Sequence, residues 1–270
     1  MKSRWMGICA LLPLAALAQA SETDVVRSLQ PVEVIGQTPL PGLTHNRDRY
    51  PGNAQFADDS AIERSKSLNL VEFMGRQLTG VTVNEVQGSP FQVDINYRGQ
   101  RLSPTLGTAQ GLSAYLDGVR INEPFGDVMN WDLLPEAAIA SIALIPGSNP
   151  LFGLNTLGGA LVLTTKSGRT HEGTEADVSI GSFGRRRLDF GHGVQWQDGW
   201  HGYLAGTLFG ENGWRAESRG RLGNIFVKLG REQAGTDWSL SWLGARSRLN
   251  GNGPLNQSLY DIDPRSGYTF

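Results

Sequence analysis

Residues Leu144 to Ser167, LIPGSNPLFGLNTLGGALVLTTKS, form the stretch around which the rest of the chain is organised. The apolar run Ile142–Ile145 has the composition of a buried strand, and Pro146-Gly147 ends it. A second apolar and β-branched run at 161–165 predicts another strand. The segment between the two runs contains three glycines, which suit positive φ or a close approach of the backbone: Gly153, Gly158 and Gly159. A strand, a glycine-rich crossover and a second strand form a compact unit that another part of the chain must cover.

Two further sequence blocks precede this stretch, Tyr97-Arg98-Gly99 and YLDGVRIN at 115–122. Inside the stretch, the pair Phe152-Gly153 and the run from Gly158 to Leu161 precede a Thr-Lys pair at 165–166. In this order the blocks resemble the plug domain of TonB-dependent outer-membrane receptors, and several blocks in order are far more specific than any one alone. The resemblance implies structural roles for five residues: Gly147, Phe152, Gly153, Gly158 and Gly159. Without it, the same pattern would also fit a soluble α+β domain with glycine-rich turns.

The composition narrows the class of protein only slightly. A formal net charge of −2 over 270 residues indicates neither a nucleic-acid-binding surface nor an acidic tail. Glycine, with 35 residues, is well above its average usage. No run approaches the ~20 apolar residues that a membrane helix requires. A membrane-embedded form of this protein would therefore have to be a barrel.

Residues 1–20 have the features of a cleaved signal peptide. A basic start is followed by an apolar core at 8–18 and by a small-x-small cleavage site at 18–20. We expect the mature chain to begin at Ser21 and to be exported. The only cysteine, Cys9, lies in the segment that would be removed, so we expect no disulfide or thiolate chemistry.

Residues 21–44 are expected to form a flexible leader, because the segment up to about residue 51 is polar and rich in proline. A short β-prone island inside it, PVEVIG at 31–36, resembles the TonB box, the segment that pairs by strand addition with the TonB energy-coupling protein. An extended peptide with unpaired backbone groups is suited to add to a sheet edge. The predicted box consists of Val32, Glu33, Val34 and Ile35. The alternative reading is that the island is simply a first strand.

The plug domain is expected at 45–168, as a small mixed sheet with short helices. A capping pattern at 60–63 and helical spacing up to Leu78 predict one helix that ends at Gly80. Four more strands are predicted, at 81–84, 92–97, 113–116 and 119–121, with Asp117-Gly118 as a hairpin turn. Two long loops are predicted at 100–111 and 122–131, followed by a short helix at 133–139 near Pro135.

Residues 169–270 are expected to form antiparallel transmembrane strands of a β-barrel. Leu188, Phe190, Val194 and Trp196 share one face of a predicted strand, whereas the opposite face carries glycine and polar residues. Similar apolar rows follow at 225–229 and 238–242. A soluble two-sheet sandwich would give similar alternation. Because a plugged transporter has about 22 strands, this segment cannot close such a barrel alone, and we expect it to be the first part of the barrel of a longer receptor.

The resemblance also implies a function. Members of this family lie in the cell outer membrane, bind a scarce nutrient complex, typically a ferric siderophore, and import it into the periplasm with energy from the inner membrane. The expected ligand-binding residues in the two long loops and beside them are Arg98, Gln100, Arg101, Gln110, Phe125 and Trp131. Arg98 is suited either to an anionic ligand or to a barrel carboxylate, and Phe125 and Trp131 either face the ligand or pack the loop. The expected partners are TonB, the nutrient ligand and the lipid of the outer membrane.

Neither an enzymatic site nor a metal site is predicted. Gly153 and Gly158 have the spacing of a P-loop, but Gly159-Ala160 stand where Lys-Ser/Thr is required. The segment at 111–115 lacks the second glycine of a nucleophile elbow. Four histidines lack the spacing of metal ligands: His45, His171, His192 and His201. We therefore expect no cofactor and no catalysis. A second hypothesis is a free-standing periplasmic plug-like binding or interaction protein, in which the last hundred residues form a soluble sheet.

Overall fold

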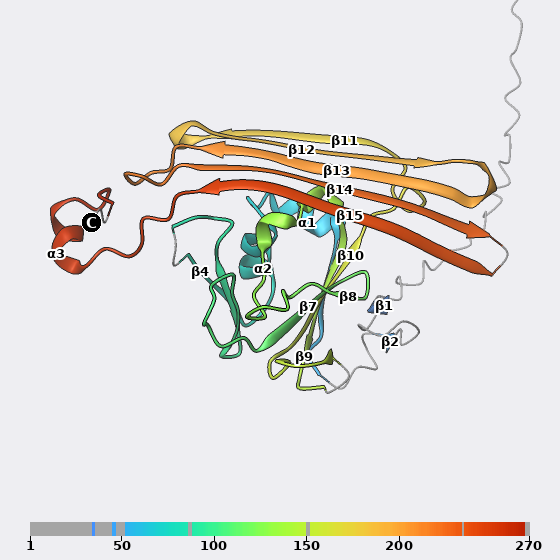
Figure 1. The fold of residues 1–270 in the computed structure, drawn as a ribbon, viewed down its shortest axis with the longest axis horizontal. Helices are drawn as coiled ribbons and strands as arrows, with labels where there is room; N and C mark the ends of the chain where they lie inside the picture. Colours follow the sequence, from blue (N-terminus) through green and yellow to red (C-terminus); the bar gives the residue numbers. More distant parts are fainter. Residues whose placement is uncertain are drawn as a thin grey trace, which may run out of the picture. The chain divides into compact units, whose positions relative to one another are not determined.

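The computed structural model describes residues 34–35, 45–46, 52–85, 88–149, 152–233 and 235–267. These residues belong to one compact unit of the chain, in which an α+β part packs against one face of a long antiparallel sheet (Figure 1). The predicted signal peptide and the box residues Val32 and Glu33 lie outside the described residues. Among the residues described, no helix is both long enough and apolar enough to cross a membrane.

The centre of the α+β part is a five-stranded mixed sheet. Its strands, in spatial order, are β3 (Gln55–Asp58), β9 (Ile139–Pro146), β10 (Gly159–Thr165), β7 (Leu112–Leu116) and β8 (Val119–Arg120). β10 pairs with β7 in parallel, and the other neighbours are antiparallel. The two strands predicted around the glycine-rich crossover are thus confirmed as direct neighbours. Ile142, Ile145 and Leu163 are fully buried, because other parts of the fold cover both faces of this sheet.

A second, three-stranded antiparallel sheet consists of β4 (Val81–Asn84), β5 (Asp94–Tyr97) and β6 (Gln100–Leu102). The turn between β5 and β6 is Arg98-Gly99, with φ of 52° and 82°. Two successive positive φ values match the turn that favours a tight hairpin. The expectation of a loop over the whole of 100–111 is therefore wrong, because its first three residues pair with β5.

Two helices stand where one was expected. α1 (Asp59–Ser65) is capped by Asp58, whose side chain accepts from the Ala61 N–H, and it ends at Lys66, with φ of 48°. α2 (Leu70–Gln77) begins after Asn69, whose side chain accepts from the Glu72 N–H at 2.8 Å. The single-helix prediction is wrong because Lys66 ends α1 in a left-handed conformation and the short polar side chain of Asn69 binds a backbone N–H and starts a new helix.

The predicted helix at 133–139 is also replaced by two shorter elements, the 3₁₀ helices η2 (Trp131–Leu133) and η3 (Glu136–Ala138). Pro135 stands between them, and Leu134 has an extended ψ of 105°. A proline disfavours helical backbone in the preceding residue, so one continuous helix cannot form here.

The long sheet has five antiparallel strands in chain order: β11 (Gly173–Gly181), β12 (Arg185–Gln195), β13 (Trp200–Glu211), β14 (Gly220–Gln233) and β15 (Thr236–Leu249). η5 (Ser182–Gly184) and η6 (Gln197–Gly199) form two of its turns, and α3 (Gln257–Ile262) follows the last strand. β11 and β15 are the edges. In the leader, β1 (Val34–Ile35) pairs with β2 (His45–Asn46).

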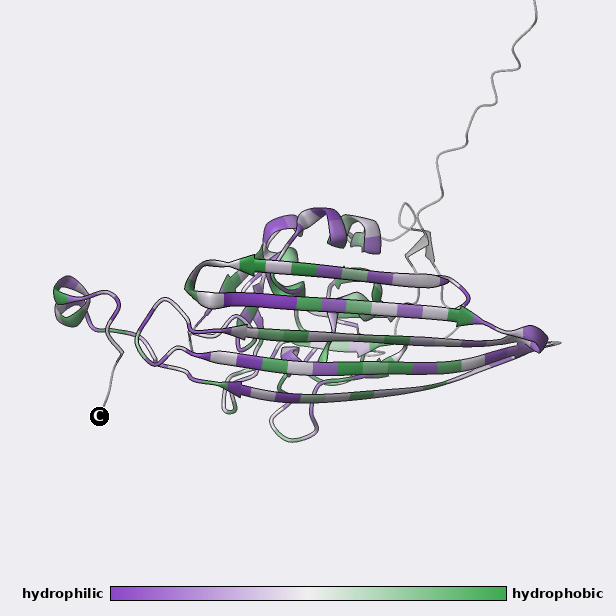
Figure 2. Ribbon diagram, turned by 90° about the horizontal axis from the view of Figure 1, so that it is seen from above, coloured by the Kyte–Doolittle hydropathy of each residue, from purple (hydrophilic) through white to green (hydrophobic). Residues whose placement is uncertain are grey.

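The long sheet is amphipathic in the sense that the sequence predicts. Tyr203, Ala205 and Phe226 point to the α+β part and are buried against Ala138 of η3. On the opposite, outward face, large apolar side chains remain open to the surroundings, and Ile180 and Val178 are 86% and 72% exposed. Figure 2 views the sheet from this side and shows hydrophobic and hydrophilic residues alternating along its strands. The expected α+β domain followed by antiparallel strands of an open sheet is therefore confirmed.

Candidate functional site

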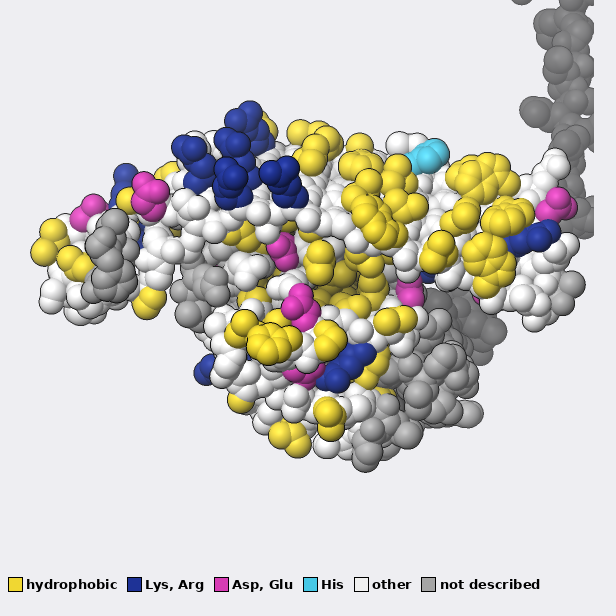
Figure 3. Space-filling model, viewed as in Figure 1, with side chains coloured by type: hydrophobic (Ala, Val, Ile, Leu, Met, Phe, Trp, Pro, Cys, Tyr) yellow, Lys and Arg dark blue, Asp and Glu magenta, His cyan; other side chains and the backbone are white. Residues whose placement is uncertain are grey.

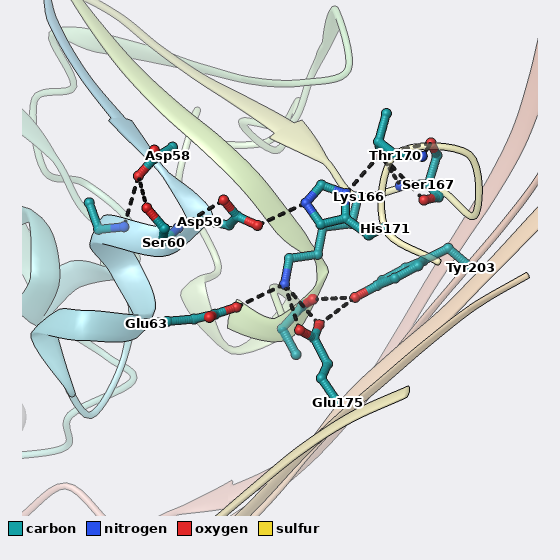
Figure 4. Close-up of polar contacts among 12 residues, drawn as sticks. Asp58, Asp59, Ser60, Glu63, Lys166, Ser167, Thr170, His171, Glu175 and Tyr203 are labelled. Carbon is teal, nitrogen blue, oxygen red and sulfur yellow. Dashed lines mark hydrogen bonds and ion pairs between the residues drawn. The ribbon is translucent and has the colours of Figure 1, made fainter. Parts of the chain in front are cut away.

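Lys166 connects the α+β part with the long sheet (Figure 4). It follows directly after β10, and its side chain is only 2% exposed. Its Nζ donates to both carboxylate oxygens of Glu175 on β11, at 2.8 and 3.0 Å, and to Glu63 of α1 at 3.2 Å. The Tyr203 hydroxyl of β13 lies 2.7 Å from the same Glu175 carboxylate. Four elements therefore meet at one buried ammonium group.

Charge is retained at this ammonium group in spite of its burial. Burial by itself lowers the pKa of Lys166. The hydrogen bonds and negative charges of Glu175 and Glu63 outweigh that effect and hold the pKa above its ordinary value of 10.5. Lys166 is therefore a cation at neutral pH, and it is stabilised by two carboxylates that are themselves 58% and 42% exposed.

Arg187 of β12 forms a second connection and is buried together with both of its carboxylate partners. It pairs with Glu136 of η3 at 3.0 Å and with Asp189 at 2.5 Å, and these side chains are 8%, 14% and 13% exposed. Its guanidinium also donates to the carbonyls of Ser67 and Leu68, between α1 and α2. Burial raises the pKa of Glu136, and Arg187 only partly offsets this.

A third connection joins the Asp117-Gly118 turn to β14. Lys228 donates to Asp117 at 3.0 Å and to the Thr165 hydroxyl at 2.9 Å. Asp117 also accepts from the Thr165 N–H and so fixes the turn to the end of β10. The contact between the α+β part and the long sheet thus consists largely of charged and hydrogen-bonded pairs, with small apolar patches around Ala138 and Phe91. Such a contact can exchange its partners for water more readily than a dry apolar one.

At one end of the long sheet, a cavity of about 510 Å³ separates the α+β part from two loops, which lie at 212–219 and 250–256. The charged residues that line it are Glu85, Asp94, Arg101 and Arg215. Arg215 is fixed by the carbonyls of Gly253, at 2.8 Å, and Ser266, at 3.0 Å. Burial raises the pKa of Glu85, and the nearby carboxylates of Glu211 and Glu72 raise it further. Arg101 and Arg215 thus line the cavity together with two carboxylates.

The structure brings only one of the six predicted ligand-binding residues, Arg101, to this cavity. Arg98 is exposed at its turn, with its guanidinium 5.1 Å from the centre of the Tyr97 ring. Within the described part of the chain, Arg98 has no carboxylate partner on the long sheet. Phe125 is 78% exposed, whereas Trp131 is 4% exposed and donates to the Val93 carbonyl at 3.1 Å.

The two predicted glutamines make contacts inside the α+β part. Gln110 accepts from the Ser103 N–H at 2.9 Å and donates to its carbonyl at 3.2 Å, which closes the loop between them. Gln100 lies against Gly111 and Gly158, where an added Cβ would come within 3 Å of its side chain. Both glutamines therefore shape the loop, and neither lines the cavity.

The glycine-rich crossover is tightly packed at its second end. Gly159 has a φ of 133°, and a Cβ there would lie 2.1 Å from the Ile145 carbonyl oxygen. Gly147 and Gly153 also have positive φ, but a Cβ on Gly147 would have nothing within 4 Å. Phe152 is buried and accepts through its carbonyl from the Tyr115 hydroxyl.

Sequence reasoning missed Arg215, Glu85 and Asp94 at the cavity and Lys166 and Arg187 at the contact. Arg215 lies in a loop that the alternation pattern only marks as a break between strands, so no signal pointed to it. Lys166 closes the motif of the opening stretch, and a lysine directly after a buried strand was a signal that could have been used. The residues described include no group of His, Cys, Asp and Glu side chains able to hold a metal ion.

The α+β part of the chain matches a known protein family. Residues 46–160 match the family model described as the TonB-dependent Receptor Plug Domain. Residues 46–160 therefore form a domain of the TonB-dependent receptor plug family. The α+β part is therefore called the plug from here on, and its resemblance to that family, predicted from three sequence blocks, is confirmed.

Known proteins extend the likeness beyond the plug. The vitamin B12 transporter BtuB of Vibrio cholerae serotype O1 is 23% identical over 158 residues, which cover 56% of this chain and 24% of the transporter. The ferric citrate transporter FecA in its unliganded form has a TM-score of 0.61 at 15% identity, covering 80% of this chain and 34% of that one. BauA, the ferric preacinetobactin receptor of Acinetobacter baumannii, has a TM-score of 0.60 at 14% identity, covering 76% and 29%.

The sequence identities and the covered lengths limit what these likenesses show. The structural likeness lies under 25% identity, so it shows a shared fold of plug and following strands. The chain spans about a quarter of the length of the curated relative that it matches. The relatives are named as receptors and transporters.

Proposed function

We propose that the protein is an outer-membrane receptor that binds a nutrient complex at the cavity lined by Arg101 and Arg215 and imports it into the periplasm. The observation that carries this proposal is a plug domain held against an amphipathic sheet by charged pairs. We infer that TonB supplies the energy through the leader at Val32 to Ile35. We further propose the domain boundaries expected from the sequence, with the plug at 45–168 and the barrel strands from 169 onward.

The dimensions of the outward face support a position in a bilayer. On β14, Arg221 and Arg231 point outward on either side of an apolar row that includes Ile225 and Val227. The two arginines are ten positions apart, or ~33 Å along a strand at ~3.3 Å per residue. A strand tilted by ~40° from the membrane normal would cover ~25 Å with this row, which is the height of the apolar band of an outer-membrane barrel. A soluble periplasmic protein would leave this apolar face uncovered, so we favour the receptor over the periplasmic alternative.

The arginines of the cavity, which lie beside the carboxylates Glu85 and Asp94, provide donors for an anionic group. Two arginines offer hydrogen bonds to carboxylate, catecholate or hydroxamate oxygens. Ferric siderophores present such oxygens around the iron, and among the structural relatives are proteins named as ferric citrate, ferric catecholate and siderophore receptors. We therefore propose a ferric siderophore as the transported ligand. The curated relative is named as a vitamin B12 transporter, so cobalamin is the ligand to test in parallel.

Replacement of Ile35 by proline tests energy coupling. Proline removes a backbone N–H that strand addition needs. We expect Ile35→Pro to abolish energised uptake of ⁵⁵Fe-siderophores while binding to the cell surface persists. Ile35→Val keeps the N–H and serves as the matched control, with uptake near that of the native protein. Loss of binding together with uptake would argue against the leader assignment, and a product found in the periplasm without detergent would argue against the receptor itself.

Replacement of Arg101 by glutamine tests the cavity. A hydrogen bond to a charged group contributes about 1.5–3 kcal/mol, so we expect Arg101→Gln to weaken binding of an anionic ferric siderophore at least about tenfold. Arg98→Gln is the matched control, because Arg98 is equally exposed but lies outside the cavity. The measurement is equilibrium binding of ⁵⁵Fe-siderophores to whole cells without an energy source, with ⁵⁷Co-cyanocobalamin as the second probe. Equal affinities of the two variants would place the ligand elsewhere.

A further inference from the structure

Four exposed arginines stand together on the outward face of the long sheet: Arg186, Arg221, Arg246 and Arg248. Strand register brings three of them into one row, since Arg186 pairs with Gly210, Gly210 with Arg221, and Arg221 with Arg248. The fourth, Arg246, lies one outward row closer to the middle of the sheet. Figure 3 shows dark blue side chains gathered over this end of the sheet and hydrophobic side chains over the rest. We call these four residues the arginine row.

The direction of these side chains follows from their neighbours along each strand. Arg187 and Leu222 point inward, to the plug, and so does Ser247, which donates to Asp132 of η2. Residues next to them therefore point outward. The described part of the chain provides no ion pair and no side-chain hydrogen bond to any member of the arginine row. Four like charges held side by side without a carboxylate repel one another, and an anionic partner would remove that repulsion.

Space for such a partner exists between the strands. Gly210 lies between Arg186 and Arg221, and a Cβ on it would meet nothing within 4 Å. The apolar rows start directly beside the arginine row, with Leu208 (55% exposed) one outward row in and Val227 (38% exposed) further along. The surface thus combines a cationic strip with a wide apolar strip, which is the order of charge and hydrocarbon in an anionic lipid.

The opposite boundary of the apolar rows has a different composition. There Trp200 and Trp238 pack edge to face, with ring centres 5.4 Å apart, and Arg231 covers the Trp200 ring at 5.3 Å. Tryptophans suit the interface of any bilayer, because one edge of the ring is polar and the rest is apolar. Of the two boundaries, only the one with the arginine row is suited to bind negative charge. The two leaflets of the bilayer around the apolar band should therefore differ in the charge of their headgroups.

We propose that the arginine row binds the phosphate groups of an anionic lipid whose acyl chains cover Leu208 and Val227. This inference rests on the proposed function, because it places the outward face of the sheet in a bilayer. Each guanidinium can offer two parallel N–H donors to phosphate oxygens. Neighbouring strands lie ~4.8 Å apart, so two or three arginines of the row reach one headgroup or two adjacent ones.

Native mass spectrometry of the detergent-purified gene product tests this proposal. The probes are phosphatidylglycerol and phosphatidylcholine with identical acyl chains. We expect the native protein to retain phosphatidylglycerol at least tenfold better than phosphatidylcholine, with retention reduced by added salt. We expect the quadruple variant Arg186→Gln, Arg221→Gln, Arg246→Gln, Arg248→Gln to lose this preference. Excess inorganic phosphate should not displace the lipid, whereas displacement would identify a free-anion site instead and overturn the lipid assignment.

Two controls keep the test decisive. The corresponding quadruple lysine variant preserves the charge and should keep a reduced preference, which separates lost charge from lost folding. Arg231→Gln removes an outward arginine at the tryptophan boundary and should leave the preference unchanged. Equal retention of the two lipids by the native protein, or an unchanged preference in the quadruple glutamine variant, would overturn the proposal. A native product that stays in solution without detergent would instead overturn the proposed function.

Discussion

Gly159→Ala should strongly destabilise the plug. The alanine Cβ would lie 2.1 Å from the Ile145 carbonyl oxygen, and the residue would have to keep a φ of 133°. Backbone strain of this kind costs about 1–3 kcal/mol, and overpacking against a fixed backbone costs about 1–3 kcal/mol more. Because domains are stable by only about 5–15 kcal/mol, we expect rapid hydrogen exchange in β9 and β10, measured by mass spectrometry on the detergent-purified protein.

Gly147→Ala is the matched control for this substitution. Gly147 has a φ of 101°, so the backbone strain remains, but its Cβ would have no neighbour within 4 Å. We expect it to cost only the strain, about 1–3 kcal/mol, and to leave β9 and β10 protected from exchange. Equal loss of protection in the two variants would show that close packing at Gly159 is not what the motif requires.

The second large effect is expected at Arg187. Arg187→Met would leave Glu136 and Asp189 buried without their cation, and breaking a buried ion pair in this way costs about 3–5 kcal/mol. The contact between the plug and β12 should therefore loosen, with faster hydrogen exchange around η3 and between α1 and α2. Arg187→Lys should not restore protection, because one ammonium group cannot reproduce the bonds to two carboxylates and two backbone carbonyls.

A double variant and a change of pH can identify which carboxylate destabilises Arg187→Met. Burial already raises the pKa of Glu136 above its ordinary value of 4.5, so the folded protein binds this proton more tightly than the unfolded chain does. The contribution of Glu136 to the free energy of unfolding therefore increases as the pH falls from neutral toward 4.5. Without Arg187 the pKa should rise further, and acidification to about pH 5 should restore part of the lost protection. Adding Glu136→Gln should restore part of the protection at pH 7 and weaken the pH dependence, with Asp189 left as the second carboxylate without its cation; independent, additive effects of the two substitutions would contradict this account.

The sequence predicts the parts of this fold in which local chemistry and global packing agree. The opening stretch gives β9 and β10, Asp117-Gly118 gives the β7–β8 turn, and alternation gives the outward rows of the long sheet. It fails at the single helix expected over 60–80, where the left-handed Lys66 ends one helix and the Asn69 side chain caps the next. Helical spacing alone cannot show such a break, because the apolar side chains continue on the same face.

The candidate site was less predictable than the fold. Arg101 could be proposed because it follows a motif, but its cavity partner Arg215 lies more than a hundred residues away in a loop without pattern. The connections at Lys166 and Arg187 join elements that only the packed structure brings together. Charged residues at alternate positions of a strand indicate which face is polar, and they do not indicate which partner each charge meets.

Because of the position of β3, the two ends of the plug should resist a pulling force unequally. β3 is the first plug strand in chain order and an edge strand of its sheet, held to β9 through four residue pairs. Tension from the N-terminus reaches β3 before any other strand of the five-stranded sheet, whereas the other end of the plug, at Gly168, lies between the carbonyls of Val194 and Gly202. A force on the N-terminus would therefore separate β3 from β9 first. β10 and the adjacent Lys166 would stay bound to the long sheet. The passage that the proposed function requires would then widen as the plug unfolds strand by strand. The whole plug would not have to leave the inside of the barrel.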